Sequence, residues 1–178
     1  IVEHFGAVAV VAIDDKGRVA MVEQYRHSVG QRLLELPAGL LDIHAEDELD
    51  CAKRELQEEA GLAAEEWGVL VDLVTSPGFA EEAVRVFIAR GLREVDRPEA
   101  EDEEADMRLS WVGIDDAAGK ALAGEITNSI AVSGILAAAH LLASGASPRS
   151  VDEPFRFRPA SLANRRSAQG IVPDMKRI

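Results

Sequence analysis

Three glutamates in one short stretch, Glu55, Glu58 and Glu59, are spaced as neighbours on a helix surface. Spacings of three and four residues bring side chains onto one helix face, one turn apart. Like charges at that spacing repel one another and weaken an isolated helix, so a compensating charge is needed. Mg²⁺ and Mn²⁺ favour carboxylate oxygens, which makes a divalent cation the simplest candidate. A solvated acidic helix face is the alternative.

The helix that must present these glutamates is predicted over residues 47–60. Acidic Asp47 and Glu48 suit its N-terminal dipole, and Gly61 fits the position at which a helix stops. Apolar side chains share one side of its helical wheel: Leu49, Ala52, Leu56 and Ala60. Because the glutamates fall beside this stripe rather than opposite it, we expect them to be partly sheltered, which favours the metal interpretation. Cys51 is expected to be a small packed residue, with ligation of a soft metal as the alternative.

The composition restricts the class of protein. The chain has 178 residues, of which 47% are hydrophobic, and this suits one domain with a single core. A net charge of −13 argues against nucleic-acid binding and disfavours an anionic substrate unless cations screen it. No apolar run in the sequence reaches the roughly 18 residues of a membrane span. The single cysteine fits a reducing compartment, so we expect a cytoplasmic location.

The remaining elements indicate a mixed α/β layered fold. Strands are predicted over 8–13, 19–24, 33–36, 67–74, 83–90 and 107–112, and further helices over 114–123 and 125–144. The first two strands read as a hairpin, and Pro37-Ala38-Gly39 reads as a loop where the backbone can approach a ligand. We expect a single domain over 1–146 and a C-terminal tail over 147–178 that is irregular or partly disordered.

The stretch around the glutamates resembles the Nudix box, G-x(5)-E-x(7)-R-E-U-x-E-E-x-G-U, where U is aliphatic. The matching residues are Glu46, Arg54, Glu55, Leu56, Glu58, Glu59, Gly61 and Leu62. The departure is at the start, where six residues instead of five separate Gly39 from Glu46. Either the loop has one extra residue or Leu40 takes the glycine position. The resemblance implies a Nudix-type α/β/α sandwich with a mixed sheet.

Segments outside the box resemble the ADP-ribose pyrophosphatase subfamily, most closely its actinobacterial members. These segments are Gln24-Tyr25-Arg26, Glu35-Leu36-Pro37-Ala38-Gly39, Pro77 and Glu103-Glu104-Ala105-Asp106. The resemblance implies metal-dependent hydrolysis of ADP-ribose to AMP and ribose 5-phosphate. Two alternatives stay open. One is a Nudix pyrophosphatase that prefers another nucleoside diphosphate derivative, such as an ADP-sugar, NADH or an oxidised dNTP. The other is a sensor that binds ADP-ribose without cleaving it.

The resemblance also assigns a metal and catalytic apparatus. Two or three Mg²⁺ or Mn²⁺ ions would be held by the box glutamates and one backbone carbonyl: Glu55, Glu58, Glu59 and Ala38. Cations would neutralise the negative charge that makes a pyrophosphate resist hydroxide. Glu58 and Arg54 are the catalytic residues within the box, and Arg54 would pair with a box glutamate to hold the helix against the loop. The general base would be Glu104, with Glu103 as the rival, on a mobile acidic loop.

Candidate substrate-binding residues lie outside the box. Arg26 would contact phosphate, because a guanidinium can engage two phosphate oxygens at once. An exposed arginine at a strand end is the alternative. Glu35 would hydrogen-bond the sugar or the base, and Gly78 and Phe79 would shape the sugar end of the pocket. Glu82 would reach the metals or the terminal ribose. For Phe79 and Glu82, simple packing and solvation are the alternatives.

The subfamily resemblance implies a homodimer that exchanges N-terminal strands, and residues 1–5 would belong to such a strand. Because the chain begins at Ile1 inside an apolar run, we expect a preceding segment that this sequence does not include. Aromatic residues make up only 4% of the chain. We therefore expect that segment or the second subunit to supply the aromatic side chain that stacks on adenine.

Overall fold

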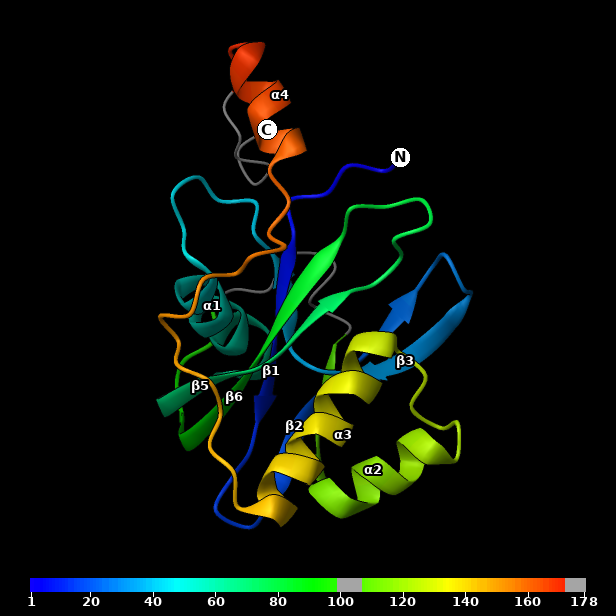
Figure 1. Cartoon of the computed structure of the whole chain (residues 1–178). Helices are drawn as coiled ribbons and strands as arrows, with labels where there is room; N and C mark the ends of the chain where they lie inside the picture. The colour runs from blue at the N-terminus through cyan, green and yellow to red at the C-terminus, as the bar shows by residue number, and fades with distance from the viewer. Residues whose placement is uncertain (99–106, 172–178) are drawn as a thin grey trace.

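Two β-sheets lie at the centre of the fold, and three of the helices in the described residues pack against them (Figure 1). The computed structural model describes residues 1–98 and 107–171. The strands are β1 (Ala7–Ala12), β2 (Arg18–Arg26), β3 (Gln31–Glu35), β4 (Ala38–Leu40), β5 (Leu62–Val74), β6 (Ala83–Glu94) and β7 (Arg108–Gly113). The helices are α1 (Glu48–Ala60), α2 (Ile114–Leu122), α3 (Ser129–Ser144) and α4 (Ser161–Ala168). One sheet has the strand order β4-β1-β6-β5 and the other β3-β2-β7.

Strand β1 lies in the middle of the molecule and is buried along its whole length. Its side chains alternate between two cores: Ala9 and Val11 face the core that contains α3, while Val8 and Val10 face the core that contains α1. β1 runs parallel to β6 and antiparallel to β4, so the four-stranded sheet is mixed. With α1 on one face and α3 on the other, the predicted α/β/α sandwich is confirmed.

The predicted hairpin between the first two strands is wrong. A turn does connect them, and the Gly17 N–H donates to the Asp14 carbonyl at 2.9 Å. Beyond a bridge between Ile13 and Val19, however, β1 and β2 separate into different sheets. A strand that is apolar on both faces is most stable at the centre of a covered sheet, and β4 and β6 occupy its two edges. A turn sequence carries no information about which distant strands fill those edges.

The predicted loop at Pro37-Ala38-Gly39 is also wrong for its last two residues. Ala38 and Gly39 begin the short strand β4 and pair with Ala9 and Val8 of β1. Three residues with a central glycine are too few to show the alternating pattern of a strand. Helix α1, in contrast, is confirmed: the Asp47 side chain caps its first turn, and Gly61 ends it with φ of 65°.

Residues after α3 pack back across the sandwich. Val69 of β5 and Arg149 exchange two backbone hydrogen bonds of 2.9 and 3.0 Å. Pro148 sits over Gly68, where an added Cβ would lie 2.4 Å from the proline ring. Helix α4 then begins near the N-terminal segment and projects away from the sheets, with Arg165 paired to Glu3 (Figure 1). The division into a domain over 1–146 and a tail over 147–178 stays a prediction.

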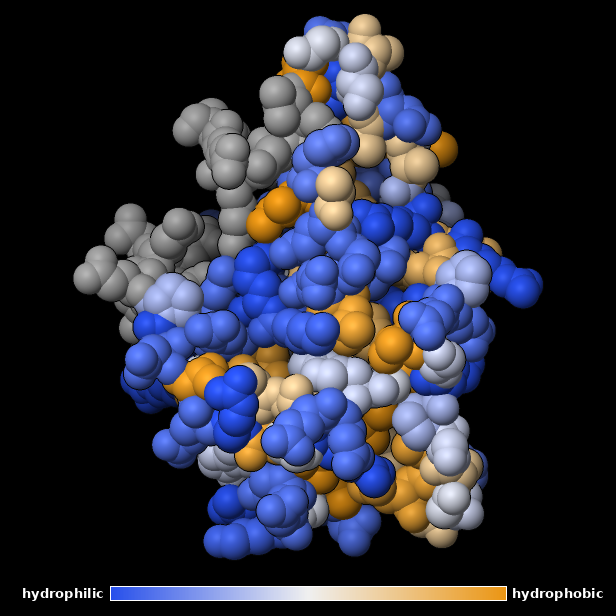
Figure 2. Space-filling view, turned by 90° about the vertical axis from the view of Figure 1, so that its left-hand side faces the viewer, coloured by the Kyte–Doolittle hydropathy of each residue, from blue (hydrophilic) through white to orange (hydrophobic). Residues whose placement is uncertain are grey.

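The side of the molecule that carries α1 is mainly hydrophilic, with small hydrophobic patches between the polar residues (Figure 2). This agrees with the net charge of −13. None of the helices in residues 1–98 and 107–171 combines the length and the apolar character needed to cross a bilayer.

A buried ion pair attaches the C-terminal segment to the sheet. Arg85 of β6 is 1% exposed, and its fork donates to both oxygens of Asp72 at 2.8 and 3.0 Å. It also donates to the Glu153 carbonyl at 2.6 Å and lies over the ring of Phe155. Burial by itself would raise the pKa of Asp72, but hydrogen bonds and charge from Arg85 and Arg149 outweigh it and lower that pKa. The pair therefore stabilises the fold above about pH 4, and this contribution is lost as the pH falls through the lowered pKa.

Replacing the buried arginine tests this attachment. Arg85→Met should lower the free energy of unfolding by about 3 kcal/mol, the low end for breaking a buried pair, because Asp72 keeps its contact with Arg149. The measurement is urea unfolding followed by circular dichroism. Arg32→Met is the matched control, since Arg32 pairs with Glu23 while 31% exposed and should cost less than about 1 kcal/mol. Equal losses of unfolding free energy in the two variants would contradict the assignment of the Arg85–Asp72 pair as a buried attachment.

Candidate active site

Arg54 of α1 connects the carboxylates of the predicted box. Its Nε and Nη2 donate to the two carboxylate oxygens of Glu46 at 2.8 and 3.0 Å. Its Nη1 donates to Glu58 at 3.0 Å and also to Glu55. Burial works to lower the pKa of Arg54, but hydrogen bonds from Glu46 and Glu55 and the charge of Glu55 raise that pKa well above its ordinary value. The guanidinium therefore stays charged and ties the loop before α1 to the helix.

The glutamates of α1 are sheltered, as their place beside the apolar stripe predicted. Glu55 and Glu59 are each 6% exposed. The Ala38 N–H donates to Glu59 at 2.9 Å, so this carboxylate lies against the β4 backbone. The carboxyl group of Glu55 lies against Gly39, where an added Cβ would be 2.0 Å from the carboxyl carbon. Glycine is therefore required at this position for the observed packing.

The donor chemistry of this group fits a divalent cation. Three carboxylates, those of Glu46, Glu55 and Glu58, share the guanidinium of Arg54, so negative charge is in excess around it. Carboxylate oxygens are the ligands that Mg²⁺ and Mn²⁺ prefer. Within the described residues, no group of three or more His, Cys, Asp and Glu side chains is gathered around one point. The glutamates are instead turned toward Arg54 and the β4 backbone.

Cys51 is a packed residue in this arrangement. It is fully buried, and its thiol donates to the Leu40 carbonyl at 3.4 Å. Burial raises the pKa of this thiol far above its usual range, so it stays protonated. Because a thiolate is the form that ligates metals, the geometry favours the packing interpretation over a soft-metal ligand.

A polar cleft of about 550 Å³ opens on the other side of β4 from α1. Ala38 and Gly39 line the cleft and also contact Glu59 and Glu55, so β4 joins the carboxylate group to the cleft. Three more residues singled out in the sequence line it: Arg26, Glu35 and Glu82. The sequence analysis missed several polar lining residues: His4, Ser28, Thr75, Ser76, Asn128 and Ser129. They come from segments far apart in the chain.

Arg26 and Glu35 form one unit within the cleft. Arg26 Nε and Nη2 donate to the two oxygens of Glu35 at 3.0 and 2.6 Å. Glu35 is 3% exposed and also accepts from Gln24 at 3.3 Å. The Arg26 side chain is 46% exposed. Arg26 is therefore an anchored cation at the edge of the cleft, and its contact with phosphate stays a prediction.

The other predicted residues divide between cleft and surface. Glu82 lines the cleft and accepts from the Thr75 hydroxyl. Gly78 and Phe79 are not among the residues that line it. Phe79 is 64% exposed, and its carbonyl accepts from the Val2 N–H at 2.7 Å. Their role at the sugar end of the pocket stays a prediction. Glu103 and Glu104 lie outside the described residues.

The first turn of α3 forms part of the cleft wall. The Asn128 side chain accepts from the Ala131 N–H at 2.9 Å and caps the helix, and Ser129 lines the cleft beside it. The positive end of the helix dipole therefore lies at the cleft and favours anionic groups there. An Asn before an apolar run is a helix-start signal in the sequence. The start at residue 125 was predicted four residues too early.

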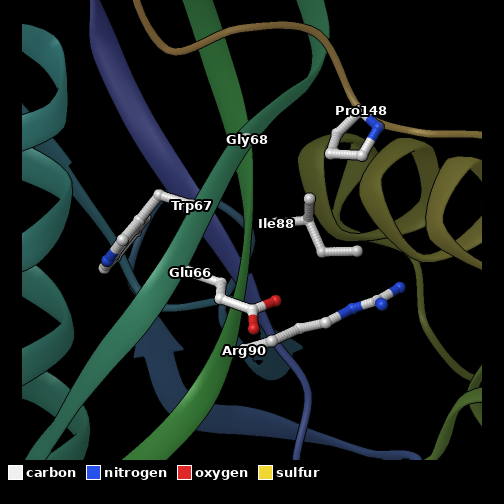
Figure 3. Close-up of a pocket in the computed structure, with 6 residues that line it drawn as sticks. All are labelled: Glu66, Trp67, Gly68, Ile88, Arg90 and Pro148. Atoms are coloured by element: carbon white, nitrogen blue, oxygen red, sulfur yellow. The ribbon is translucent and has the colours of Figure 1, made fainter.

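A second, smaller pocket of about 120 Å³ lies where residue 148 crosses β5 and β6. Figure 3 shows Glu66 and Arg90 next to each other at one end of this pocket and Ile88 and Pro148 at the other. None of the residues singled out in the sequence lines it. Its volume is below the range of roughly 300–1,000 Å³ that small-molecule sites occupy. The cleft beside β4 is the candidate site, because residues singled out in the sequence line it.

Comparison with known proteins agrees with this geometry. The family model described as the NUDIX domain matches residues 3–130, which is most of the chain. The chain belongs to the Nudix family. Nudix hydrolases generally use divalent metal ions such as Mg²⁺.

Two relatives carry the same name. The chain is 56% identical over 167 residues to the ADP-ribose pyrophosphatase of Mycobacterium tuberculosis, covering 94% of this chain and 81% of the relative. It is 40% identical over 117 residues to the ADP-ribose pyrophosphatase of Bacillus subtilis, covering 66% of this chain and 63% of the relative. The predicted resemblance to actinobacterial Nudix proteins is confirmed by the first of these.

Two further similarities are to a relative with a different name and to a solved structure of low sequence identity. The methanol dehydrogenase activator of Bacillus methanolicus is 40% identical over 117 residues, covering 66% of this chain and 63% of the relative. A solved structure described as an ADP compounds hydrolase superposes with a TM-score of 0.69 over 79% of this chain and 74% of that chain. Its sequence identity is 21%, so it shows a shared fold alone.

The close approach of Gly39 to Glu55 predicts a selective defect. In Gly39→Ala the new Cβ would displace the Glu55 carboxylate, which is the end of a flexible side chain, so the fold should survive. Mn²⁺ affinity should fall about 10- to 100-fold, the usual cost of disturbing groups that orient metal ligands. Calorimetric titration with Mn²⁺ and a thermal melt measure the two effects. Gly119→Ala is the control, because no atom lies within 4 Å of its added Cβ. Unchanged Mn²⁺ affinity in Gly39→Ala would rule out Glu55 as a ligand.

Proposed function

We propose that this protein is a metal-dependent ADP-ribose pyrophosphatase that forms AMP and ribose 5-phosphate. The observation that carries the proposal is the position of β4, whose residues contact the sheltered carboxylates of α1 and also line the polar cleft. The similarity to the M. tuberculosis ADP-ribose pyrophosphatase supports the choice of substrate.

In this proposal the metal ions belong to the α1 side of β4. Two or three Mg²⁺ or Mn²⁺ ions are held by Glu55, Glu58, Glu59 and the Ala38 carbonyl. When bound, they supply positive charge that offsets the charge developing on the pyrophosphate. Arg54 keeps the loop and the helix together through Glu46, so the ligands stay near β4.

The cleft side of β4 receives the substrate. Arg26, held by Glu35, contacts a phosphate, and the positive end of α3 adds to the attraction. These local charges, with the metal ions, allow an anionic substrate to bind a protein of net charge −13. Glu35 and Glu82 offer acceptors for sugar or base hydroxyl and amino groups. Gly78 and Phe79 contribute to the sugar end.

The general base in this proposal is Glu104, with Glu103 as the alternative. Neither residue is on α1, so the base and the metal ligands are on separate parts of the chain.

The proposed assembly is a homodimer with exchanged N-terminal strands. Val2 forms backbone hydrogen bonds with Phe79 and Glu81 at 2.7 and 3.1 Å, so the segment has strand-like pairing on one edge. Ile1, Val2 and Phe79 expose apolar side chains there. A second subunit would cover this edge and bring an aromatic side chain for adenine. A cytoplasmic location stays a prediction.

A substrate panel tests the activity. ADP-ribose should give the highest kcat/KM among ADP-ribose, ADP-glucose, NADH, diadenosine polyphosphates and 8-oxo-dGTP, with AMP as a product. The rate should require Mg²⁺ or Mn²⁺ and vanish with EDTA, because the carboxylates alone cannot neutralise the pyrophosphate. A higher kcat/KM for another compound would favour the alternative Nudix pyrophosphatase. ADP-ribose binding without cleavage would favour a sensor.

The identity of the base has a separate test. Glu104→Gln should lower kcat for ADP-ribose about 10²- to 10⁴-fold, the usual contribution of general base catalysis. Mn²⁺ affinity, measured calorimetrically, should stay near the wild-type value, because the metal ligands lie on α1 and β4. Glu103→Gln is the matched comparison. If Glu103→Gln causes the large loss and Glu104→Gln does not, the base is Glu103.

A further inference from the structure

The N-terminal segment contributes to the cleft a histidine that was not a candidate site residue in the sequence. His4 lines the cleft together with Glu82 and Thr75. Its backbone N–H donates to the Glu81 side chain at 3.3 Å, and Val2 is paired with the same loop. The histidine is therefore held in place by its own backbone and not only by its ring.

The hydrogen bonds of His4 decide which ring nitrogen carries a proton. The Gly6 N–H donates to His4 Nδ1 at 3.1 Å, so Nδ1 is an acceptor and bears no proton. The proton of a neutral ring is then on Nε2, which lies 3.5 Å from Oε1 of Glu82. That distance is longer than an N–H···O hydrogen bond, and catalytic contacts that are long in an unliganded protein often tighten when substrate binds. His4 thus directs a donor at the Glu82 carboxylate.

Glu82 also has a hydrogen-bond partner at its other oxygen. The Thr75 hydroxyl donates to Oε2, while His4 approaches Oε1. The Glu82 side chain is 31% exposed, so it faces the cleft rather than the core. A glutamate with a neighbouring polar group at each oxygen has less rotamer freedom before a ligand arrives, and this reduces the entropy cost of binding.

We propose that His4 is a positioning residue that orients Glu82 toward hydroxyl groups of the substrate's terminal sugar. The inference rests on the proposed function, in which Glu82 contacts that sugar. Oriented carboxylate oxygens suit the vicinal hydroxyls of a ribose, each of which can donate one hydrogen bond. The competing role for His4 is local, namely to accept the Gly6 N–H and shape the N-terminal turn.

Two amide substitutions separate these roles. His4→Gln places an amide near the Nε2 position, so it keeps a donor to Glu82 and loses the acceptor for Gly6. His4→Asn places an amide near Nδ1, so it keeps the acceptor and loses the donor. We expect His4→Asn to raise KM for ADP-ribose about 2- to 12-fold, the range of one net hydrogen bond, with kcat nearly unchanged. His4→Gln should stay near the wild-type KM. His140→Asn and His140→Gln are controls, because His140 is exposed on α3.

A double-mutant cycle completes the test. In a Glu82→Gln background, His4→Asn should add no further rise in KM, because the group it positions has been altered. The inference is overturned if His4→Gln raises KM while His4→Asn does not, if both raise it equally, or if the effect persists with Glu82→Gln. Thermal melts of every variant identify loss of fold. The wild-type rate on ADP-ribose tests the proposed function separately. If another ribose-bearing compound of the substrate panel is preferred, the same comparison of KM values is made with that compound. If the protein cleaves none of the compounds in the panel, both proposals are overturned.

Discussion

The guanidinium of Arg54 is the contact on which the rest of the site depends. Without a positive charge between them, Glu55 and Glu58 of α1 would repel each other and would also repel Glu46 in the loop before the helix. Arg54 offsets part of that repulsion and crosslinks the loop through a two-pronged contact with Glu46. Because one positive charge serves three carboxylates, the group keeps a negative excess. The same interaction therefore holds the site together and leaves it suited to cations.

The location of this group follows from the burial of β1. Since β1 is apolar on both faces, α1 and α3 cover opposite sides of its sheet. β4 pairs with β1 along the edge that lies between α1 and the cleft. A Cβ at Gly39 would collide with the end of the Glu55 side chain, so the glycine lets that carboxylate lie against β4. β4 therefore contacts both the carboxylate group of α1 and the cleft.

Residues after the family domain also support this region. Arg158 donates to the Glu48 carboxylate at 2.9 Å and to the Glu46 carbonyl at 3.4 Å. Arg158 therefore contacts the loop that contains Glu46, the residue whose carboxylate binds Arg54. The buried pair of Arg85 and Asp72 anchors the same C-terminal segment farther back on the sheet. The family match ends at residue 130, but the similarity to the M. tuberculosis relative extends over 167 residues, in keeping with a structural role for this segment.

The sequence by itself determined α1, its stop at Gly61, the shelter of its glutamates and the family. These features depend on spacings within one or two helical turns, so they can be deduced without knowledge of the fold. Only the tertiary structure decided that β1 and β2 separate, that β4 is a strand, and that His4, Thr75 and Asn128 share a cleft with Glu82. Strand pairing and cleft walls join residues far apart in the chain. No local periodicity specifies those partners, because they are chosen by which apolar faces can be buried together.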